Sequence, residues 1–166
     1  WEYACRAGTA TTYSHGNFSE RMTTVANVAD AAFEAQYPEL KGLVKASDGY
    51  AYTSPAGSFL PNPFGLCDMH GNVWNWCSDW HGDYAPLPSV NPRGATTGSE
   101  RVFRGGSYII KSWAVRSAIR NWEHPSSWYS YIGFRPVMLS QALRRHSVAE
   151  ANGTGESVGS LNKEKT

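Results

Sequence analysis

The chain has 166 residues and a formal net charge of +1, with 17% charged and 13% aromatic residues. This length suits a single domain with a core of its own. A net charge so close to zero argues against a nucleic-acid binder, which would carry a basic stripe, and no apolar run reaches the roughly 20 residues that a membrane span needs.

The first half of the chain predicts short helices between ordered loops. Residues 1–8 are typical of the end of a helix that stops at Gly8. Residues 30–43 carry a short helical pattern that Pro38 ends. From residue 48 to residue 63, frequent Gly, Pro, Asn and Asp residues predict a succession of turns.

The second half predicts short strands. Residues 73–79 are compatible with either a helix or a strand, because their alternation is ambiguous. Residues 101–108 predict a strand ended by the pair Gly105-Gly106, and residues 132–138 predict another. The sequence therefore favours an α+β domain with little regular structure.

The composition changes after Met138. Residues 139–166 contain no aromatic side chain and are rich in Ser, Gly, Asn, Glu and Lys. Such a segment cannot build a core, so we expect a folded domain over residues 1–138 and a polar tail that is disordered from about Ala149.

The long loops need buried partners for their backbone polar groups. Indole N–H groups and guanidinium groups can donate to loop carbonyls. We expect three tryptophans and four arginines to do so: Trp74, Trp76, Trp80, Arg104, Arg116, Arg120 and Arg135.

The cysteines and histidines show no spacing typical of a zinc site. We interpret Cys5, Cys67 and Cys77 as small buried hydrophobic residues, with one disulfide compatible with export. The histidines are expected to be surface residues or hydrogen-bonded structural residues: His15, His70, His81, His124 and His146.

Seven motifs occur in the order typical of one family: WEYACRAGT, ANVAD, DGYAYTSPAGSFLPNPFGL, DMHGNVWNWCSDW, RVFRGGSY, VRSAIRN and IGFRP. Together they resemble the sulfatase-modifying factors, whose founding members are the formylglycine-generating enzymes. The resemblance covers residues 1 to about 137 and implies a C-type-lectin-like fold with a small twisted sheet, few helices and much ordered loop. It also implies a further portion ahead of Trp1, so we expect the chain to be a fragment of unknown localisation.

The resemblance implies a copper-dependent oxidase that converts a sulfatase cysteine to formylglycine. In the family, two thiolates just beyond the RGGS-aromatic motif hold the copper. Here Ile110 occupies the position of the first thiolate, the second falls between Trp113 and Val115, and no cysteine follows Cys77. Because Cu(I) requires soft sulfur ligands, we expect no copper cofactor.

The resemblance also implies a calcium site formed by Asn27, Val28, Asp48 and Tyr50. Side-chain and main-chain oxygens of this kind suit Ca²⁺. The alternative is an Asx-turn at Asn27 and another turn at Asp48, neither of which requires an ion.

A second family calcium site would use main-chain oxygens around Gly71 and Val73 together with a glutamate. This chain has Asn75 at the glutamate position. Because an amide brings no charge, we expect this second site to be weak or empty.

The segment between the glycine pair and the last strand carries side chains suited to binding. Large aromatic rings give contact area at a low entropic cost. The family's fold is also the ligand-binding scaffold of the variable proteins of diversity-generating retroelements. The candidate residues are Ile109, Ile110, Trp113, Trp122, Trp128 and Tyr131, and the alternative is that they complete a small core.

Two functions follow. The first is a catalytically silent or re-purposed domain, expected to be monomeric, that binds a peptide or another ligand through the aromatic segment. The alternative is a formylglycine-generating oxidase that works without the thiolate pair.

Overall fold

The computed structural model describes residues 1–84, 90 and 92–138. The chain divides into two compact units, residues 1–135 and 136–166. The first unit holds the helices and strands below, and the predicted polar tail at 139–166 lies outside the described residues.

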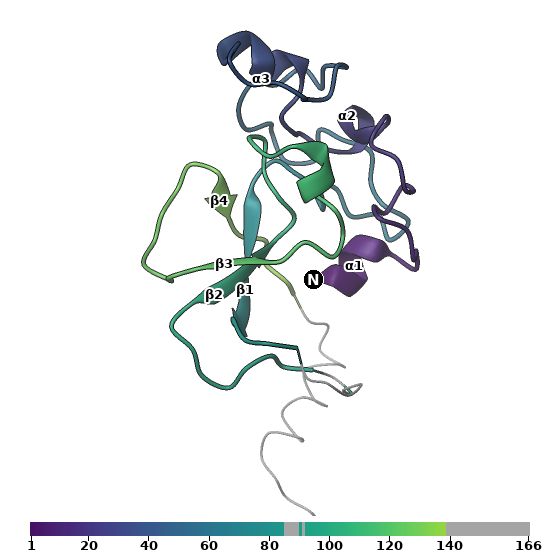
Figure 1. Ribbon diagram of the computed structural model, residues 1–166. Coiled ribbons are helices and arrows are strands. Elements are labelled where there is room, and N and C mark those ends of the chain that lie inside the picture. Colours follow the sequence, from purple (N-terminus) through teal and green to yellow (C-terminus); the bar gives the residue numbers. More distant parts are fainter. Residues whose placement is uncertain (85–89, 91, 139–166) are drawn as a thin grey trace, which may run out of the picture. The chain divides into compact units, whose positions relative to one another are not determined.

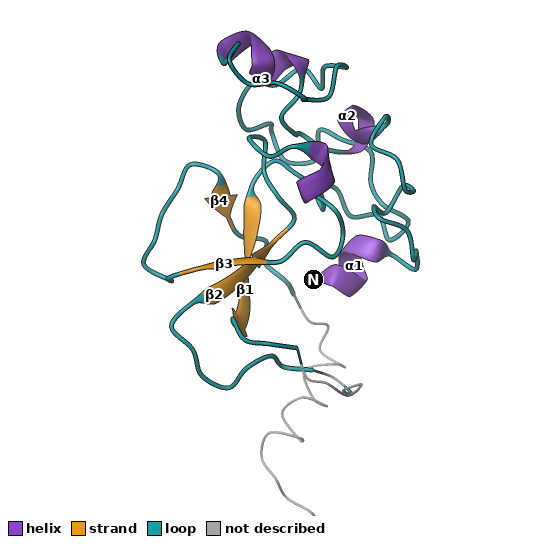
Figure 2. Cartoon of the chain, in the orientation of Figure 1, coloured by secondary structure: helices purple, strands orange, loops and turns teal. Residues whose placement is uncertain are grey.

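The helices are short and separated by loops (Figure 2): α1 (Glu2–Arg6), α2 (Met22–Val25), α3 (Ala31–Gln36) and the 3₁₀ turn η1 (Ser112–Ala114). None of those in the described part of the chain is long and apolar enough to cross a membrane. The predicted stop of the first helix is confirmed, because Ala7 (φ 49°) and Gly8 (φ 88°) both adopt the left-handed conformation that ends helices.

The helix α3 has a clear start and stop. The Asp30 carboxylate accepts hydrogen bonds from the backbone N–H groups of Ala32 (2.8 Å) and Phe33 (3.2 Å), which satisfies donors at the helix N-terminus. The helix ends at Gln36, before the predicted breaker Pro38.

Four strands form one sheet in the order β3-β2-β1-β4 (Figure 1). They are β1 (Trp74–Trp80), β2 (Arg101–Arg104), β3 (Asn121–Glu123) and β4 (Ile132–Gly133). The pairs β1–β2 and β2–β3 are antiparallel, whereas β4 runs parallel to β1. The ambiguous segment 73–79 is therefore a strand, and the strand predicted at 132–138 is much shorter than expected.

The tryptophans of β1 pack rather than bind loop carbonyls. Trp74 and Trp76 lie edge-on to Phe103, with ring centroids 4.9 and 5.4 Å away, and the Arg101 guanidinium lies 3.5 Å from the centroid of Trp80. Among the described residues, none of these indole N–H groups donates to a loop carbonyl as expected; side chains two apart on a strand share one face, and here Trp74 and Trp76 meet Phe103 on β2.

The arginines do bind loop carbonyls, as expected. Arg104 donates to the carbonyls of Ala118 (3.3 Å) and Ile119 (3.2 Å), and Arg120 donates to that of Gly82 (2.7 Å). Arg135 donates to the Cys67 carbonyl and Arg116 more weakly to that of Trp113, at 3.5 Å. These guanidinium groups fix irregular backbone that no strand partner satisfies.

Buried side chains form two hydrophobic clusters beside the sheet. The first joins Tyr13, Met22, Ala26, Val28 and Val115, and the second joins Ala29, Phe33, Leu43 and Tyr108. The green turn of η1 lies close to the segment that carries α2 (Figure 1), and the Tyr13 hydroxyl donates to the Ser112 carbonyl (3.0 Å). The loop-rich N-terminal half therefore packs against the segment that follows the glycine pair.

A tight turn at Gly71 and Asn72 links the N-terminal half to the glycine pair and the segment that follows it. The Gly71 N–H donates to the Gly105 carbonyl (2.9 Å), and the Asn72 N–H donates to the Asn27 carbonyl (2.8 Å). Gly71 has φ 71°, and a Cβ there would overlap the Asn27 carbonyl group, lying 2.9 Å from its carbon. Only glycine therefore fits at position 71, where the backbone passes close to the backbone of Asn27.

The substitution Gly71→Ala is expected to lower the free energy of unfolding by about 3 kcal/mol or more, because left-handed backbone strain adds to a clash with main chain. Gly57→Ala is the matched control, since Gly57 has a similar φ of 82° but open space around its Cβ position. Denaturant unfolding of both variants measures the difference, and equal losses would contradict the close approach at Gly71.

Candidate functional site

The structure brings the two thiolate positions together, but as part of the core. Val115 is fully buried, and Ile110 packs against the cluster that contains it. Trp113, between them, is 66% exposed and does not join this cluster. An aliphatic side chain therefore occupies the first expected thiolate position, another lies at the end of the range expected for the second, and neither can bind a metal.

The three cysteines are free thiols elsewhere in the fold. Burial raises the pKa of Cys5 to about 11, and its Sγ lies 3.6 Å from the Met69 carbonyl. Burial also raises the pKa of Cys77, whose Sγ contacts the carbonyl of Asn75 on its own strand. Within the described residues, no group of three or more His, Cys, Asp or Glu side chains is arranged to hold a metal ion.

The first predicted calcium set comes together around the Asp48 carboxylate. This carboxylate accepts hydrogen bonds from the N–H groups of Val28 (3.0 Å) and Tyr50 (2.8 Å). The Asp48 N–H donates to the buried carboxylate of Asp30. Burial, with Asp30 nearby, raises the pKa of Asp48 to about 6 in spite of these N–H donors.

Asn27, the residue before Val28, supplies a buried amide oxygen without a hydrogen-bond partner. Asn27 is fully buried, and its Nδ2 donates to the Tyr52 carbonyl (2.7 Å). Its Oδ1 is buried and has no hydrogen-bond partner. An orphaned buried amide oxygen is a ligand of the kind that a hard cation such as calcium accepts. The Asx-turn interpretation applies at Asp48, through the Tyr50 N–H, but the amide of Asn27 reaches a distant loop instead.

The second predicted calcium set does not fit an ion. The Asn75 Nδ2 donates to the Val73 carbonyl (3.0 Å), and the Asn75 Oδ1 accepts from the Trp1 indole N–H (3.0 Å). The Asn75 amide thus points an N–H group at the Val73 carbonyl, and its oxygen already accepts a hydrogen bond from Trp1. The Gly71 N–H is paired with the Gly105 carbonyl, so this region is held by hydrogen bonds.

The predicted ligand-binding residues are divided between surface and core. Trp128 is 88% exposed and Trp122 is 41% exposed. Ile109 and Tyr131 are partly buried against the cluster of Phe33 and Tyr108, and Ile110 packs on the other cluster. The indoles therefore do not complete the core, whereas the aliphatic residues contribute to it.

Two rings of this set are stacked on neighbours outside it. Trp122 on β3 stacks on His81, with ring centroids 3.7 Å apart, and Tyr131 stacks on Tyr129 at 5.1 Å. None of the three cavities described, with volumes of about 330, 510 and 390 Å³, is lined by the predicted ligand-binding residues.

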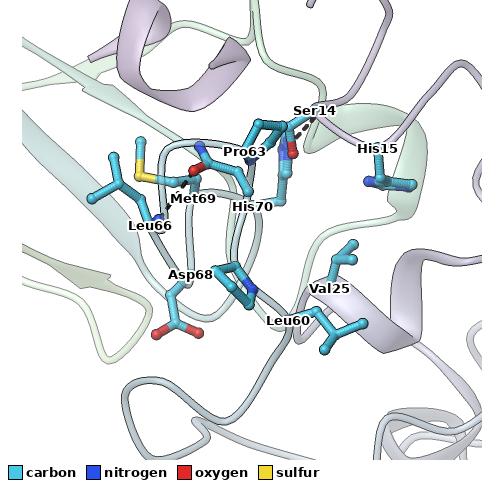
Figure 3. A pocket seen from close by; sticks show the side chains of 11 residues that line it. Ser14, His15, Val25, Leu60, Pro63, Leu66, Asp68, Met69 and His70 are labelled. Carbon is cyan, nitrogen blue, oxygen red and sulfur yellow. Dashed lines mark hydrogen bonds between the residues drawn. The ribbon is translucent and has the colours of Figure 1, made fainter. Parts of the chain in front are cut away.

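One cavity that the sequence did not indicate lies between the loop at residues 14–15 and the loop at residues 60–70 (Figure 3). It has a volume of about 330 Å³, and two histidines line it, His15 and His70. The only sequence signal was the histidines themselves, which lie far apart in the chain and show no motif spacing.

Comparison with known proteins identifies relatives of the whole described domain. Residues 1–139 match the family model of the sulfatase-modifying factor enzyme 1-like domain. The formylglycine-generating enzyme of Streptomyces coelicolor is 38% identical over 141 residues, which are 81% of this chain and 43% of that enzyme. The chain therefore spans less than half the length of this curated relative.

Solved structures show the same fold. Variable protein 1 of Treponema denticola matches with a TM-score of 0.66 and 28% identity, covering 81% of this chain and 43% of that one. PvdO from Pseudomonas aeruginosa matches with a TM-score of 0.63 and 35% identity, covering 80% and 47%. The chain has the loop-rich α+β, C-type-lectin-like fold that its motifs predict.

The substitution Asn75→Ala is expected to lower the free energy of unfolding by about 1–3 kcal/mol, because it leaves the Trp1 indole and the Val73 carbonyl unpaired. Asn121→Ala on β3 is the matched control, since the Asn121 side chain is exposed and bonds only the next backbone N–H. Urea unfolding of both variants checks this, and a loss at Asn75 no larger than at Asn121 would contradict the described role.

Proposed function

Because the chain belongs to the sulfatase-modifying factor family, we propose that it is a member without thiolate–copper chemistry that binds a peptide or another ligand. One observation carries this proposal. Ile110 stands at the first expected thiolate position and Val115 within the range expected for the second, residues 113–115, and both pack into the Tyr13–Met22 cluster. Neither side chain can bind copper or reduce oxygen, and Cys5 offers a single buried thiol, whose Sγ lies 3.7 Å from His70 Nε2.

The exposed rings after the glycine pair support the binding half of the proposal. Trp113, Trp122 and Trp128 present large rings at the surface, and exposing such rings is unfavourable unless a partner covers them. Aromatic side chains of this kind provide most of the energy of many interfaces. The bound ligand would contact these rings without undergoing oxidation.

We further propose that Asn27, Val28, Asp48 and Tyr50 hold calcium. The ion would pair the orphaned Asn27 amide oxygen and neutralise the Asp48 carboxylate, which lies beside Asp30. It would supply structural stability and no chemistry, by holding the loop at residue 27 to the loop at residues 48–50.

The function is tested with a fluorescent sulfatase peptide of sequence pattern C-x-P-x-R, incubated with the chain, copper and oxygen. We expect binding, read as an increase in fluorescence anisotropy, without formylglycine in the mass spectrum. Trp128→Ala is expected to weaken binding, by about 2 kcal/mol if the ring is a hot spot. Product above a no-enzyme control would contradict catalytic silence, and an unchanged anisotropy would contradict binding of this peptide class.

A pair of restoring substitutions serves as the control for copper. Ile110→Cys with Val115→Cys places two thiols in the cluster, and this variant is expected to bind Cu(I) more tightly than either single variant. Competition with a chromophoric Cu(I) chelator measures the difference. If the unaltered chain already competes as well as the double variant, its copper ligands are other residues and the proposal fails.

Calcium is expected to raise the melting temperature of the chain relative to EDTA, since an ion at one hundred times its dissociation constant adds about 2.7 kcal/mol to the folded state. Asp48→Ala should melt at a lower temperature and lose the calcium dependence. Asp79→Ala, which removes an exposed carboxylate on β1, should keep it. Identical melting of the unaltered chain in calcium and in EDTA would disprove the site.

A further inference from the structure

The cavity between residues 14–15 and residues 60–70 brings a serine hydroxyl next to a buried imidazole. The Ser14 Oγ lies 3.1 Å from the Nε2 of His70, and both residues line the cavity (Figure 3). We propose that Ser14 is a nucleophile for acyl transfer, with His70 as its general base, and that it acts on small thioesters and aryl esters. This activity is independent of the peptide binding and of the calcium site proposed above.

Ser14 lies at the tip of a tight turn. The Tyr13 N–H donates to the Gly16 carbonyl (2.9 Å), and the Gly16 N–H donates back to the Tyr13 carbonyl (3.2 Å). The buried Tyr13 anchors this turn, because its hydroxyl donates to the Ser112 carbonyl (3.0 Å). Ser14 itself is partly exposed, so its hydroxyl is open to a substrate that enters the cavity.

His70 has the protonation state that a general base requires. Its ring is 2% exposed, and its Nδ1 lies 2.7 Å from the Val115 carbonyl. Because a carbonyl can only accept, Nδ1 carries the proton and Nε2 carries the lone pair. Nε2 therefore accepts from the Ser14 hydroxyl, and also from the Ser14 N–H (3.2 Å), which fixes the serine main chain. A hydroxyl within reach of a base that a third group orients is the arrangement used in nucleophilic catalysis.

The surroundings of His70 keep it neutral but weakly basic. Burial lowers the pKa of His70 to about 4, and the nearby His15 acts in the same direction, whereas the hydrogen bond to Val115 opposes them. Nε2 is thus free to take a proton at neutral pH, but the imidazolium that forms is unfavourable. Cys5 does not compete as a nucleophile, because its thiol is fully buried and burial raises its pKa to about 11.

The residues that line the cavity offer no free side-chain amide to stabilise an oxyanion. Asn62 is the only amide among them, and its Nδ2 donates to the carbonyls of Ala4 (2.7 Å) and Cys5 (3.2 Å). One such donor commonly contributes about 10²–10³-fold in rate. A weak base without this help displaces only a leaving group that departs easily, so the substrate is a thioester or an aryl ester rather than an amide.

The remaining lining favours a small substrate without negative charge. The volume of about 330 Å³ lies at the lower end of the range for small-molecule sites. The only charged residue of the lining is Asp68, and its Oδ1 is buried without a hydrogen-bond partner, so the site disfavours an anionic ester. Aliphatic side chains suit a short acyl group: Val25, Leu60, Leu66 and Met69.

The reaction is a two-step acyl transfer. As the Ser14 Oγ forms a bond to the acyl carbon, its proton passes to the Nε2 of His70. The bond from the acyl carbon to the leaving sulfur or oxygen breaks, and the leaving group takes the proton from Nε2. Water then attacks the acyl-serine and passes one proton through Nε2 to Oγ, which releases the carboxylic acid and restores both residues.

Mass spectrometry of the full chain tests the first step. The chain is incubated with 4-nitrophenyl acetate, quenched with acid and digested, and acetylated residues are located in the peptides. We expect Ser14 to be acetylated at least tenfold faster than Ser126, whose hydroxyl lies 2.7 Å from the exposed His124 but lines none of the three cavities described. Absence of acetyl-Ser14, or equal rates at the two serines, would overturn the proposal.

Variants assign the two roles. Ser14→Ala should remove the burst of 4-nitrophenolate that accompanies acetylation, whereas Ser126→Ala should keep it. His70→Asn keeps an N–H for the Val115 carbonyl and should slow the acetylation of Ser14 about a hundredfold or more. If His70→Asn fails to fold, the unaltered chain is compared in H₂O and D₂O. Acetylation of Ser14 should be slower in D₂O because a proton moves during the attack, and equal rates would disprove general-base catalysis.

Three thioesters with the same acyl group test the substrate class: acetylthiocholine, its uncharged analogue S-(3,3-dimethylbutyl) thioacetate, and S-acetyl-3-mercaptopropionate. We expect the first two to acetylate Ser14 and the anionic third to do so at least tenfold more slowly, because of the Asp68 carboxylate. Equal rates with the anionic thioester would contradict the assignment of this cavity as the substrate site. None of these outcomes depends on peptide binding at the exposed tryptophans.

Discussion

The fold depends on how a loop-rich chain satisfies its buried backbone polar groups. Asn72 shows the solution most clearly. Its side-chain amide accepts from the Ser54 N–H (3.0 Å) and donates to the Ser54 carbonyl (3.1 Å), so that one buried side chain acts as a missing strand partner. Its own backbone binds the Asn27 carbonyl and receives the Tyr108 N–H (2.9 Å). Three distant loops are thereby tied to one turn.

The candidate ion sites lie beside this turn for the same reason. Where loops meet, each buried carbonyl or amide oxygen needs a hydrogen-bond donor or a cation as its partner. At Asn75 an amide N–H faces the Val73 carbonyl, and the arrangement closes without an ion. At Asn27 the amide oxygen has no donor. Both positions carry asparagine, so the hydrogen bonds that each amide makes, and not the residue type, distinguish the two regions.

Local chemistry in the sequence predicted the elements that residues define by themselves. The helix stop at Gly8 and the arginines that bind loop carbonyls were predicted because each follows from one residue type. The strand β3 and the packing of the tryptophans on Phe103 were not, because both depend on partners that are distant in the sequence. The cavity lined by His15 and His70 was not predicted for the same reason, since its two histidines meet only through tertiary structure.

Val115 lies in the range expected for the second thiolate, and its main chain also contacts the cavity that His15 and His70 line. Its side chain fills the core cluster, while its carbonyl receives the Nδ1–H of His70 and so fixes the ring that forms the cavity wall. A carbonyl makes this bond whatever side chain the residue carries. An aliphatic residue within this expected thiolate range therefore leaves the cavity wall behind it intact, because the core cluster and the cavity wall use different atoms of the same residue.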